Sequence, residues 1–158
     1  MSPKISIFTT LCSLVLFTSP VSANTVTLAE LSPKQVGTLR FVTEVFAEQP
    51  ALIKVAFCES SLEHTEEDGS VKRGDVDSRD TGLMQINKGY HAKKAKELGL
   101  NLENQEDNAK YAIWLFENQG LQPWSSSKPC WKNLKLPKLE YADNVESKGK
   151  NNKVSNPR

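Results

Sequence analysis

Apolar residues recur at helical spacing in several stretches of the chain, and capping or turn residues separate these stretches. In "LSPKQVGTLRFVTEVF", Ser32 is followed by Pro33 and Gln35, the pattern of a helix start with a capping box. Pro50 opens a second predicted helix over about 51–63, in which apolar residues cover nearly every side. A helix of this kind is buried over most of its surface, so we expect it to lie in the core.

Two further helices are predicted in the second half of the chain. The stretch "KGYHAKKAKELGL" is short and ends at Gly99, a residue typical of helix C-termini. The stretch "NQEDNAKYAIWLFENQG" has Asn104 as an N-terminal cap and Gly120 just past its last turn. The expected buried positions are Ala92, Ala95 and Leu98 in the first of these helices, and Ala109, Ala112, Ile113 and Phe116 in the second.

The segment between the second and third predicted helices is rich in Gly and Asp and has no helical period. It reads "EHTEEDGSVKRGDVDSRDTG", and its Asp68-Gly69 pair is typical of a hairpin turn. The predicted fold class is therefore mainly α: a helical domain with a small β-hairpin or loop excursion between Glu63 and Asp80.

The first residues have the features of a secretory signal. Lys4 precedes an apolar run from Ile5 to Phe17, and Val21-Ser22-Ala23 is a small-x-small cleavage site. The apolar run is shorter than the roughly 20 residues that cross a bilayer. We therefore expect residues 1–23 to be removed on export to the periplasm or the extracellular space, with no stable membrane insertion afterwards.

The rest of the chain divides into one domain and a tail. Residues 24–142 are long enough to form a single domain with its own core. From Asp143 the sequence "DNVESKGKNNKVSNPR" is polar and basic, with almost nothing to bury, so we expect residues 143–158 to be disordered.

Charge argues against a nucleic-acid partner. The chain has 20 Lys and Arg against 19 Asp and Glu, and Lys4 leaves with the signal. The exported chain is therefore neutral and has no basic excess to meet phosphates.

Two of the three cysteines remain after signal cleavage, Cys58 and Cys130. In an oxidising compartment a disulfide between them is the simplest use of an even pair, and two buried free thiols are the alternative. There is no CxxC or Cys/His cluster, and the Asp75, Asp77 and Asp80 spacing lacks the Gly and Glu of a calcium loop. We expect no metal and no cofactor.

Glu59 is the candidate for catalysis. It shares one face of the second predicted helix with apolar residues, so water around it is limited. Burial raises the pKa of a carboxyl group, which then donates a proton near neutral pH, and cleavage of a glycosidic bond needs such a donor. The alternative is a surface or salt-bridged Glu. The apolar residues on this face are Leu52, Val55, Ala56 and Leu62.

The combination of "CES" at 58–60 with "DTGLMQIN" at 80–87 resembles the lysozyme-like superfamily. The Glu-Ser pair and the run from Gly82 to Ile86 are similar to motifs of the soluble lytic transglycosylase domain, and "DNAKYAIWL" is similar to its third motif. "DTGLMQIN" also resembles a motif of animal-type lysozymes. The likeness covers about residues 51–131; the Ala-Tyr-Asn-Ala-Gly run of many transglycosylases is missing, and "PWSSSKPCW" stands in its place.

The resemblance implies a lysozyme-like helical fold around a saccharide groove. It makes Glu59 the catalytic acid and places Gln85 and Asn87 at the sugar sites. Asn108 and Tyr111 are implied as residues that support the groove.

Asp80 divides two mechanisms. As a second carboxylate beside Glu59 it would stabilise or attack the sugar cation, and lysozyme is the standard example of that chemistry. In the transglycosylase route no second carboxylate is required, because Glu59 acts as acid and then as base. The alternative for Asp80 is a turn residue that hydrogen-bonds the backbone before Gly82.

Aromatic and hydroxyl groups near these motifs are candidates for sugar contacts. Tyr90 and Trp124 are candidates for stacking, with core packing as the alternative for Trp124. Ser78 is a candidate hydrogen-bonding residue, or a plain turn residue. His64 and His91 are expected at the surface.

The sequence thus predicts an exported muramidase that binds peptidoglycan glycan strands and cleaves the β-1,4 bond between N-acetylmuramic acid and N-acetylglucosamine. The lytic transglycosylase route is preferred, because the Gly82–Ile86 run and the Asn108 segment are closest to that family. The alternatives are a lysozyme-type hydrolase using Glu59 and Asp80, and a module that binds glycan without cleaving it. The sequence identifies no protein partner.

Overall fold

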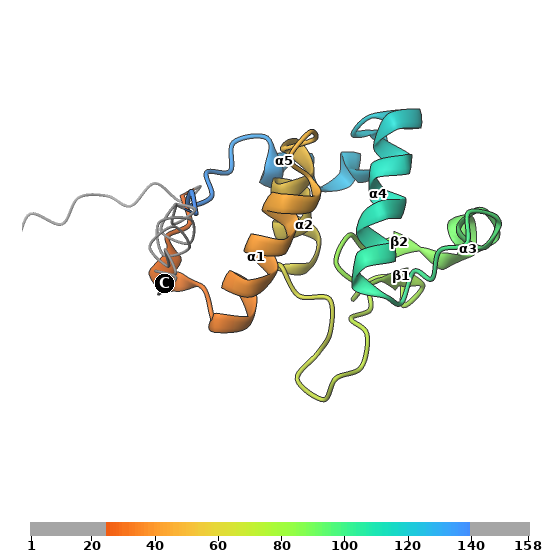
Figure 1. The fold of residues 1–158 in the computed structure, drawn as a ribbon, viewed down its shortest axis with the longest axis horizontal. Helices are drawn as coiled ribbons and strands as arrows, with labels where there is room; N and C mark the ends of the chain where they lie inside the picture. Colours follow the sequence, from red (N-terminus) through yellow and green to blue (C-terminus); the bar gives the residue numbers. More distant parts are fainter. Residues whose placement is uncertain (1–24, 140–158) are drawn as a thin grey trace, which may run out of the picture.

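The computed structural model describes residues 25–139, which lie inside the predicted domain at 24–142. The predicted signal peptide at 1–23 and the tail at 143–158 lie outside the described residues. Helices dominate the described part, as predicted (Figure 1). Their bounds are η1 Leu28–Glu30, α1 Pro33–Val45, α2 Ala51–Ser60, α3 Lys88–Glu97, α4 Gln105–Gln119, η2 Gln122–Ser127 and α5 Lys128–Trp131.

The helix starts and stops follow the capping residues of the sequence. Ser32 caps α1, and the reciprocal bonds of the capping box with Gln35 are present. Asn104 caps α4 by accepting a hydrogen bond from the Asp107 amide, and Gly120 ends that helix with a φ of 60°. Helix α2 ends at Ser60, three residues earlier than predicted, because Ser61 and the residue after it turn left-handed.

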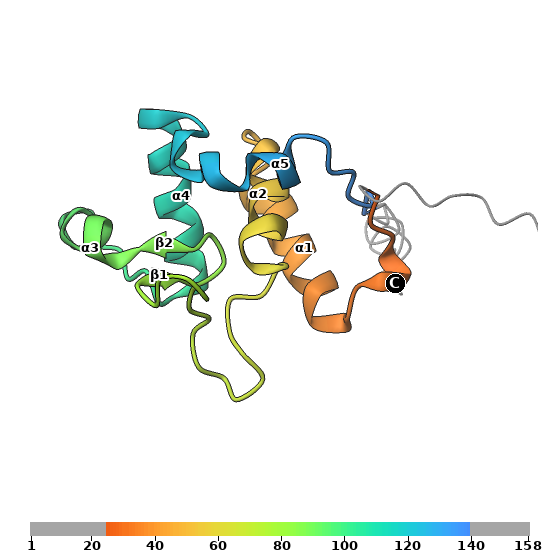
Figure 2. The ribbon, with the colours of Figure 1, turned by 180° about the vertical axis from the view of Figure 1, so that it is seen from behind.

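The core lies between α1, α2, α4 and η2. Figures 1 and 2 show α1 and α2 on one side of the molecule and α3, α4 and the hairpin on the other, with η2 and α5 joining the two sides. The most deeply buried large side chains include Phe46, Leu52, Leu62, Leu83, Met84, Tyr111 and Leu115. The second predicted helix is therefore a core helix, as its apolar circumference indicated.

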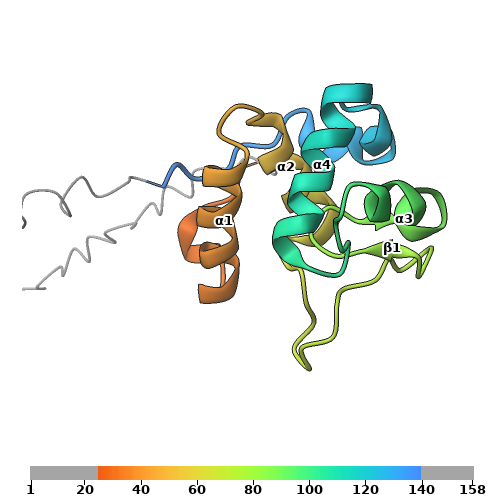
Figure 3. The same ribbon diagram turned by 45° about the vertical axis from the view of Figure 1, so that its right-hand side comes forward.

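Helix α3 packs on the outside of α4 and the hairpin, as the turned view in Figure 3 shows. Of the three positions predicted as its buried side, Ala95 is buried, whereas Ala92 and Leu98 are exposed. That prediction was wrong for two of the three residues, because α3 contacts the core through a narrow strip. In α4, Ala109 and Ala112 are buried as predicted, and Ile113 and Phe116 are half-buried.

A small two-stranded antiparallel sheet follows the long loop after α2. Strand β1 (Asp80–Thr81) pairs with β2 (Ile86–Asn87), and Asp80 lies opposite Asn87 in the register. Isolated bridges inside the loop join Thr65 to Val71 and Arg73 to Thr81. The predicted small β-hairpin is present, and its paired strands begin at the end of the predicted range, at Asp80.

The predicted disulfide joins Cys58 in α2 to Cys130 in α5, with a Cα–Cα distance of 6.0 Å. A parallel bridge pairs Thr25 with Lys135, so the two ends of the described chain lie together. No helix within residues 25–139 is both long and apolar enough to cross a membrane.

Loss of the disulfide is predicted to destabilise the fold strongly. The bond closes a loop with a sequence separation of 72 residues. On the chain-entropy model such a cross-link contributes about 4 kcal/mol to the free energy of unfolding. We expect the oxidised protein to lose about this amount when dithiothreitol is added, as measured by urea denaturation. The double variant Cys58→Ala/Cys130→Ala is the control, because reductant should leave its stability unchanged; a wild-type protein equally insensitive to reductant would contradict the prediction.

Candidate active site

Glu59 lies in the last turn of α2, with its side chain half-buried. Its carboxylate Oε1 accepts a hydrogen bond of 2.5 Å from the Ser127 hydroxyl at the end of η2. The pKa of Glu59 is raised above its ordinary value, first because burial penalises the carboxylate; the Ser127 bond lowers it, and the negative charge of Asp80 raises it further. The net effect is a carboxyl group that keeps its proton to higher pH than an exposed Glu.

Asp80 lies in β1, close enough for its charge to act on the carboxyl group of Glu59. Its Oδ1 accepts a 2.7 Å hydrogen bond from the side-chain amide of Asn87, the residue opposite it in the hairpin. The same amide donates to Asp77 at 3.0 Å. Hydrogen bonds from Arg79 are the largest cause holding the pKa of Asp77 well below its ordinary value. The Asp80 side chain is thus oriented by the Asn87 side chain, and the residue lies in a strand. In the turn alternative, the Asp80 side chain would instead hydrogen-bond to the backbone.

The buried turn between β1 and β2 is held by side chains from three other segments. The Leu83 amide donates to His64 Nδ1 at 3.1 Å, and the Met84 amide donates to Asn108 Oδ1 at 2.9 Å. The Met84 carbonyl accepts from the Trp124 indole at 3.0 Å. This turn is therefore fixed to α4, to η2 and to the loop after α2.

Gly82 allows the close approach of His64 to this turn. Its φ is +70°, and a Cβ added there would lie 2.5 Å from His64 Cε1. Any other residue would thus be strained in its backbone and would collide with the imidazole. Gln85 also has a positive φ, 46°, and its side-chain amide donates to the Gly82 carbonyl at 2.8 Å.

The surface prediction for His64 was wrong. The side chain is 4% exposed, Nδ1 accepts from Leu83, and Nε2 lies 2.8 Å from the Glu103 carbonyl. Because a carbonyl only accepts, Nε2 carries the proton and the ring is neutral. Burial lowers the pKa of His64, and it also lowers that of His91, which is half-buried against the Tyr111 hydroxyl.

Asn108 and Tyr111 lie behind the site. Asn108 is fully buried, and its amide nitrogen donates to the carbonyls of Thr81 and Leu102, both at 2.9 Å. With the Met84 bond, both hydrogens and the oxygen of that side-chain amide have protein partners. Tyr111 is also fully buried. Both residues therefore support the hairpin and α3 from within, and neither presents its side chain to a ligand.

The other predicted contact residues differ in exposure. Tyr90 is 76% exposed, with the Arg79 guanidinium 5.9 Å from its ring centroid, and Ser78 is exposed in the loop. Trp124 is only 4% exposed, so it packs in the core and offers no open face for stacking. The structure thus groups Glu59 with Asp80 and Asn87, leaves Tyr90 and Ser78 at the surface, and places Trp124 beneath.

Ser127 was missed by the sequence analysis. It lies in the "PWSSSKPCW" run, where three consecutive serines give no reason to select one. The available signal was its spacing to Cys130: a cysteine bonded to Cys58 brings the preceding turn next to Glu59, which follows Cys58 directly. The contact depends on that long-range pairing.

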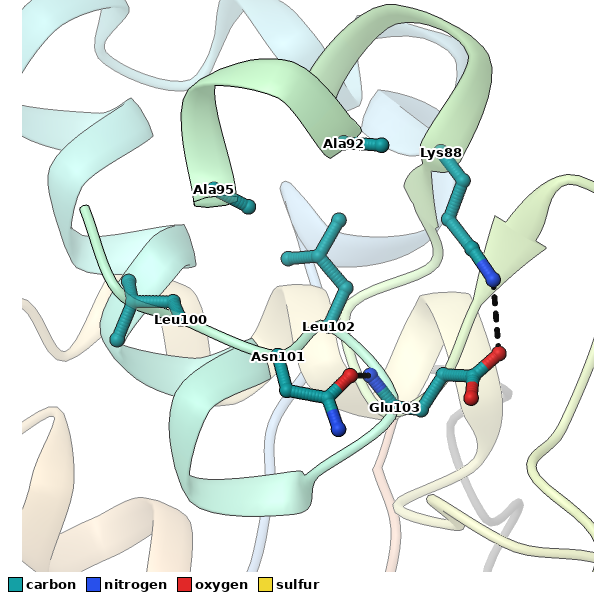
Figure 4. Close-up of a pocket in the computed structure, with 7 residues that line it drawn as sticks. All are labelled: Lys88, Ala92, Ala95, Leu100, Asn101, Leu102 and Glu103. Carbon is teal, nitrogen blue, oxygen red and sulfur yellow. Dashed lines mark hydrogen bonds and ion pairs between the residues drawn. The ribbon is translucent and has the colours of Figure 1, made fainter. Parts of the chain in front are cut away.

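A cleft of about 120 Å³ lies apart from Glu59, Asp80 and Ser127, between α3 and the loop that leads to α4 (Figure 4). At its rim Glu103 accepts from Lys88 at 2.8 Å and from Arg73 at 2.6 Å. These contacts, that of Lys88 first, lower the pKa of Glu103 to about 2. None of the predicted site residues lines the cleft. Within residues 25–139 no group of three or more His, Cys, Asp or Glu is arranged to hold a metal ion.

Removal of the Asn108 amide is predicted to destabilise the hairpin. Asn108→Ala leaves the Met84 amide and the Thr81 and Leu102 carbonyls buried without this partner. We expect a loss of about 3 kcal/mol in the free energy of unfolding, measured by urea denaturation. The control is Asn118→Ala on the same helix, where the side chain is exposed. Equal effects of the two variants would contradict this prediction.

Stability is predicted to fall in mild acid because of His64. Burial lowers the pKa of His64 in the folded protein below its ordinary value of 6.5, so under acid conditions the unfolded chain binds more protons than the folded one. The stability that depends on neutral His64 is fully present above pH 6.5 and is lost as the pH falls from there through the folded pKa. We expect His64→Gln to flatten the dependence of unfolding free energy on pH. If His64→Gln keeps the wild-type slope of unfolding free energy against pH and His91→Gln removes it, the pH dependence arises from His91 and the prediction is wrong.

Comparison of the chain with protein-family models, with curated proteins and with solved structures finds no match. The interpretation of the site therefore depends on its own residues and geometry.

Proposed function

We propose that this protein is a peptidoglycan-cleaving muramidase with a lysozyme-like fold. It acts on the β-1,4 bond between N-acetylmuramic acid and N-acetylglucosamine, with Glu59 as general acid. The observation that carries the proposal is the half-buried Glu59 carboxyl group, whose pKa is raised by burial and by the charge of Asp80 in the hairpin. The sequence motifs that suggested this substrate, at 58–60 and 80–87, lie on these two elements.

The chemistry follows from the state of Glu59. Protonation of the glycosidic oxygen makes the departing sugar a good leaving group while positive charge develops at the anomeric carbon. A raised pKa keeps the proton on the Glu59 carboxyl group to higher pH than on an exposed Glu, and this is the proton that is given up in the transition state. The negative charge of Asp80 nearby contributes both to retaining that proton and to stabilising the developing cation.

Two routes complete the reaction. In the lytic transglycosylase route, which the sequence motifs favour, the Glu59 carboxylate next acts as base and the C6 hydroxyl of the muramic acid attacks the anomeric carbon. The product is a 1,6-anhydro sugar, and no water is consumed. The hydrolytic route is the second candidate, and the orientation of Asp80 by Asn87 favours it, because a fixed carboxylate is what that route requires.

Export is part of the proposal. The disulfide between Cys58 and Cys130 is typical of proteins in oxidising compartments. Peptidoglycan lies in such compartments, in the periplasm or outside the cell.

Digestion of purified peptidoglycan tests the function. We expect the wild-type protein to release muropeptides, and Glu59→Gln to reduce the rate at least about a hundredfold, because the amide has no proton of suitable acidity to donate. Glu63→Gln is the matched control. Glu63 follows the same helix and is half-buried, and its Oε2 lies 3.7 Å from the Lys72 Nζ. Undiminished activity in Glu59→Gln would remove the proposed mechanism, and binding of peptidoglycan without any product would favour the non-catalytic module.

Mass spectrometry of the same products separates the routes. Muropeptides one water lighter than the hydrolysis products carry 1,6-anhydro ends and identify a transglycosylase, in which Asp80→Asn has a small effect. Reducing ends identify a hydrolase, in which Asp80→Asn is expected to be as damaging as Glu59→Gln.

A further inference from the structure

The Ser127 hydroxyl has two neighbours and one hydrogen. Its Oγ lies 2.5 Å from Oε1 of Glu59 and 3.1 Å from the backbone carbonyl of Trp124. A serine hydroxyl donates one hydrogen bond and accepts up to two, whereas a carbonyl only accepts. The hydroxyl therefore donates to Glu59 or to Trp124, and the choice depends on whether Glu59 carries a proton.

Each protonation state of Glu59 has a complete set of hydrogen bonds at this position. When Glu59 is ionised, the Ser127 hydroxyl donates to the carboxylate. When Glu59 is protonated at Oε1, its O–H donates to Ser127 Oγ, and the serine hydrogen turns to the Trp124 carbonyl. The rearrangement requires only a rotation of the hydroxyl about the Cβ–Oγ bond, with no movement of heavy atoms.

The segment that carries Ser127 is held at three points. The Trp124 carbonyl also accepts a 3.0 Å hydrogen bond from the Trp131 indole, and the Trp124 indole donates to the Met84 carbonyl at 3.0 Å. Three residues after Ser127, Cys130 is bonded to Cys58, the neighbour of Glu59 in the chain. None of these attachments titrates near neutral pH, so the hydroxyl stays beside Glu59 in either state.

We propose that Ser127 is a positioning residue that serves Glu59 in both of its protonation states, by reversing its hydrogen bond between the Glu59 carboxyl group and the Trp124 carbonyl. This inference builds on the proposed function, in which Glu59 first gives up a proton and then acts as a carboxylate. Ser127 orients the acid before proton donation, and its hydroxyl stabilises the carboxylate that results.

Few other charges act on Glu59. Of the segments packed against α2, η2 has no ionisable side chain and α5 begins with Lys128. The hairpin contributes Asp80, whose charge raises the pKa of Glu59. The effect of a Ser127 substitution on the titration of Glu59 is therefore interpreted with few other charged groups to consider. Helix α1, on the other side of α2, carries Lys34, Arg40 and Glu44.

The direct test follows the titration of Glu59 by carbon-detected NMR of its side-chain carboxyl group in the purified protein. Ser127→Ala removes the donor to the carboxylate, so the titration midpoint is expected to move to higher pH. Ser126→Ala, at the exposed neighbouring serine, is expected to leave the midpoint unchanged. An unchanged midpoint in Ser127→Ala would overturn the inference.

A second pair of variants separates the hydroxyl from general packing and still applies if Ser127→Ala folds poorly. Ser127→Thr and Ser127→Val have side chains of nearly the same shape, and only the first keeps a hydroxyl. We expect the Ser127→Thr midpoint to stay near the wild-type value and the Ser127→Val midpoint to be higher. Equal midpoints in the two variants would overturn the inference, since shape alone would then explain the effect.

Kinetic measurements test whether Ser127 contributes to the proposed reaction. In Ser127→Ala we expect kcat to fall about tenfold, the loss typical of one hydrogen bond to a charged group, with KM little changed. The limb of the pH profile that reports deprotonation of Glu59 should shift to higher pH, and Ser127→Thr should restore it. The NMR titration needs no substrate. If Glu59→Gln keeps full activity, the proposed function fails, while the hydrogen-bond reversal is still judged by the titration.

Discussion

The backbone from Thr81 to Met84 is buried, and the amides and carbonyls of this turn need partners that a two-residue strand pair cannot provide. His64, Asn108 and Trp124 supply them from three separate segments. Each of these side chains is itself buried, so its position is set by the core around it. The arrangement of the site follows, because Asp80 stands at the start of this turn and Trp124 is three residues before Ser127.

Opposing effects from the surrounding core act on the pKa of Glu59. Burial and the charge of Asp80 favour its neutral form, and the hydroxyl of Ser127 favours its charged form. Burial and the Asp80 charge alone would raise the pKa of Glu59 further, and the Ser127 bond partly offsets that rise. An acid catalyst has to change its protonation state during the reaction, so this balance bears on the role proposed for Glu59.

The parts of the fold that depend on local chemistry were predictable from the sequence. Ser32 and Asn104 cap helices through contacts within three residues, and Gly120 ends one through its own backbone. His64, Trp124 and Ser127 depend instead on contacts 19, 40 and 68 residues away along the chain. No local pattern marks such residues, since a histidine after a helix or a serine among serines is compatible with either surface or core. Asp80 is an intermediate case, in which the motif selected the residue as a candidate and only the structure gave its partner, Asn87.

The bond between Cys58 and Cys130 also determines how the protein carries mechanical load. Tension applied to the two ends of the described chain passes along residues 25–58, crosses the sulfur bridge, and leaves through residues 130–139. Residues 59–129, which include the hairpin, α3 and α4, lie outside this path as long as the bridge is intact. A protein pulled between two attachment points would therefore extend its outer segments first, and the part that holds Asp80 and Ser127 would not be stretched.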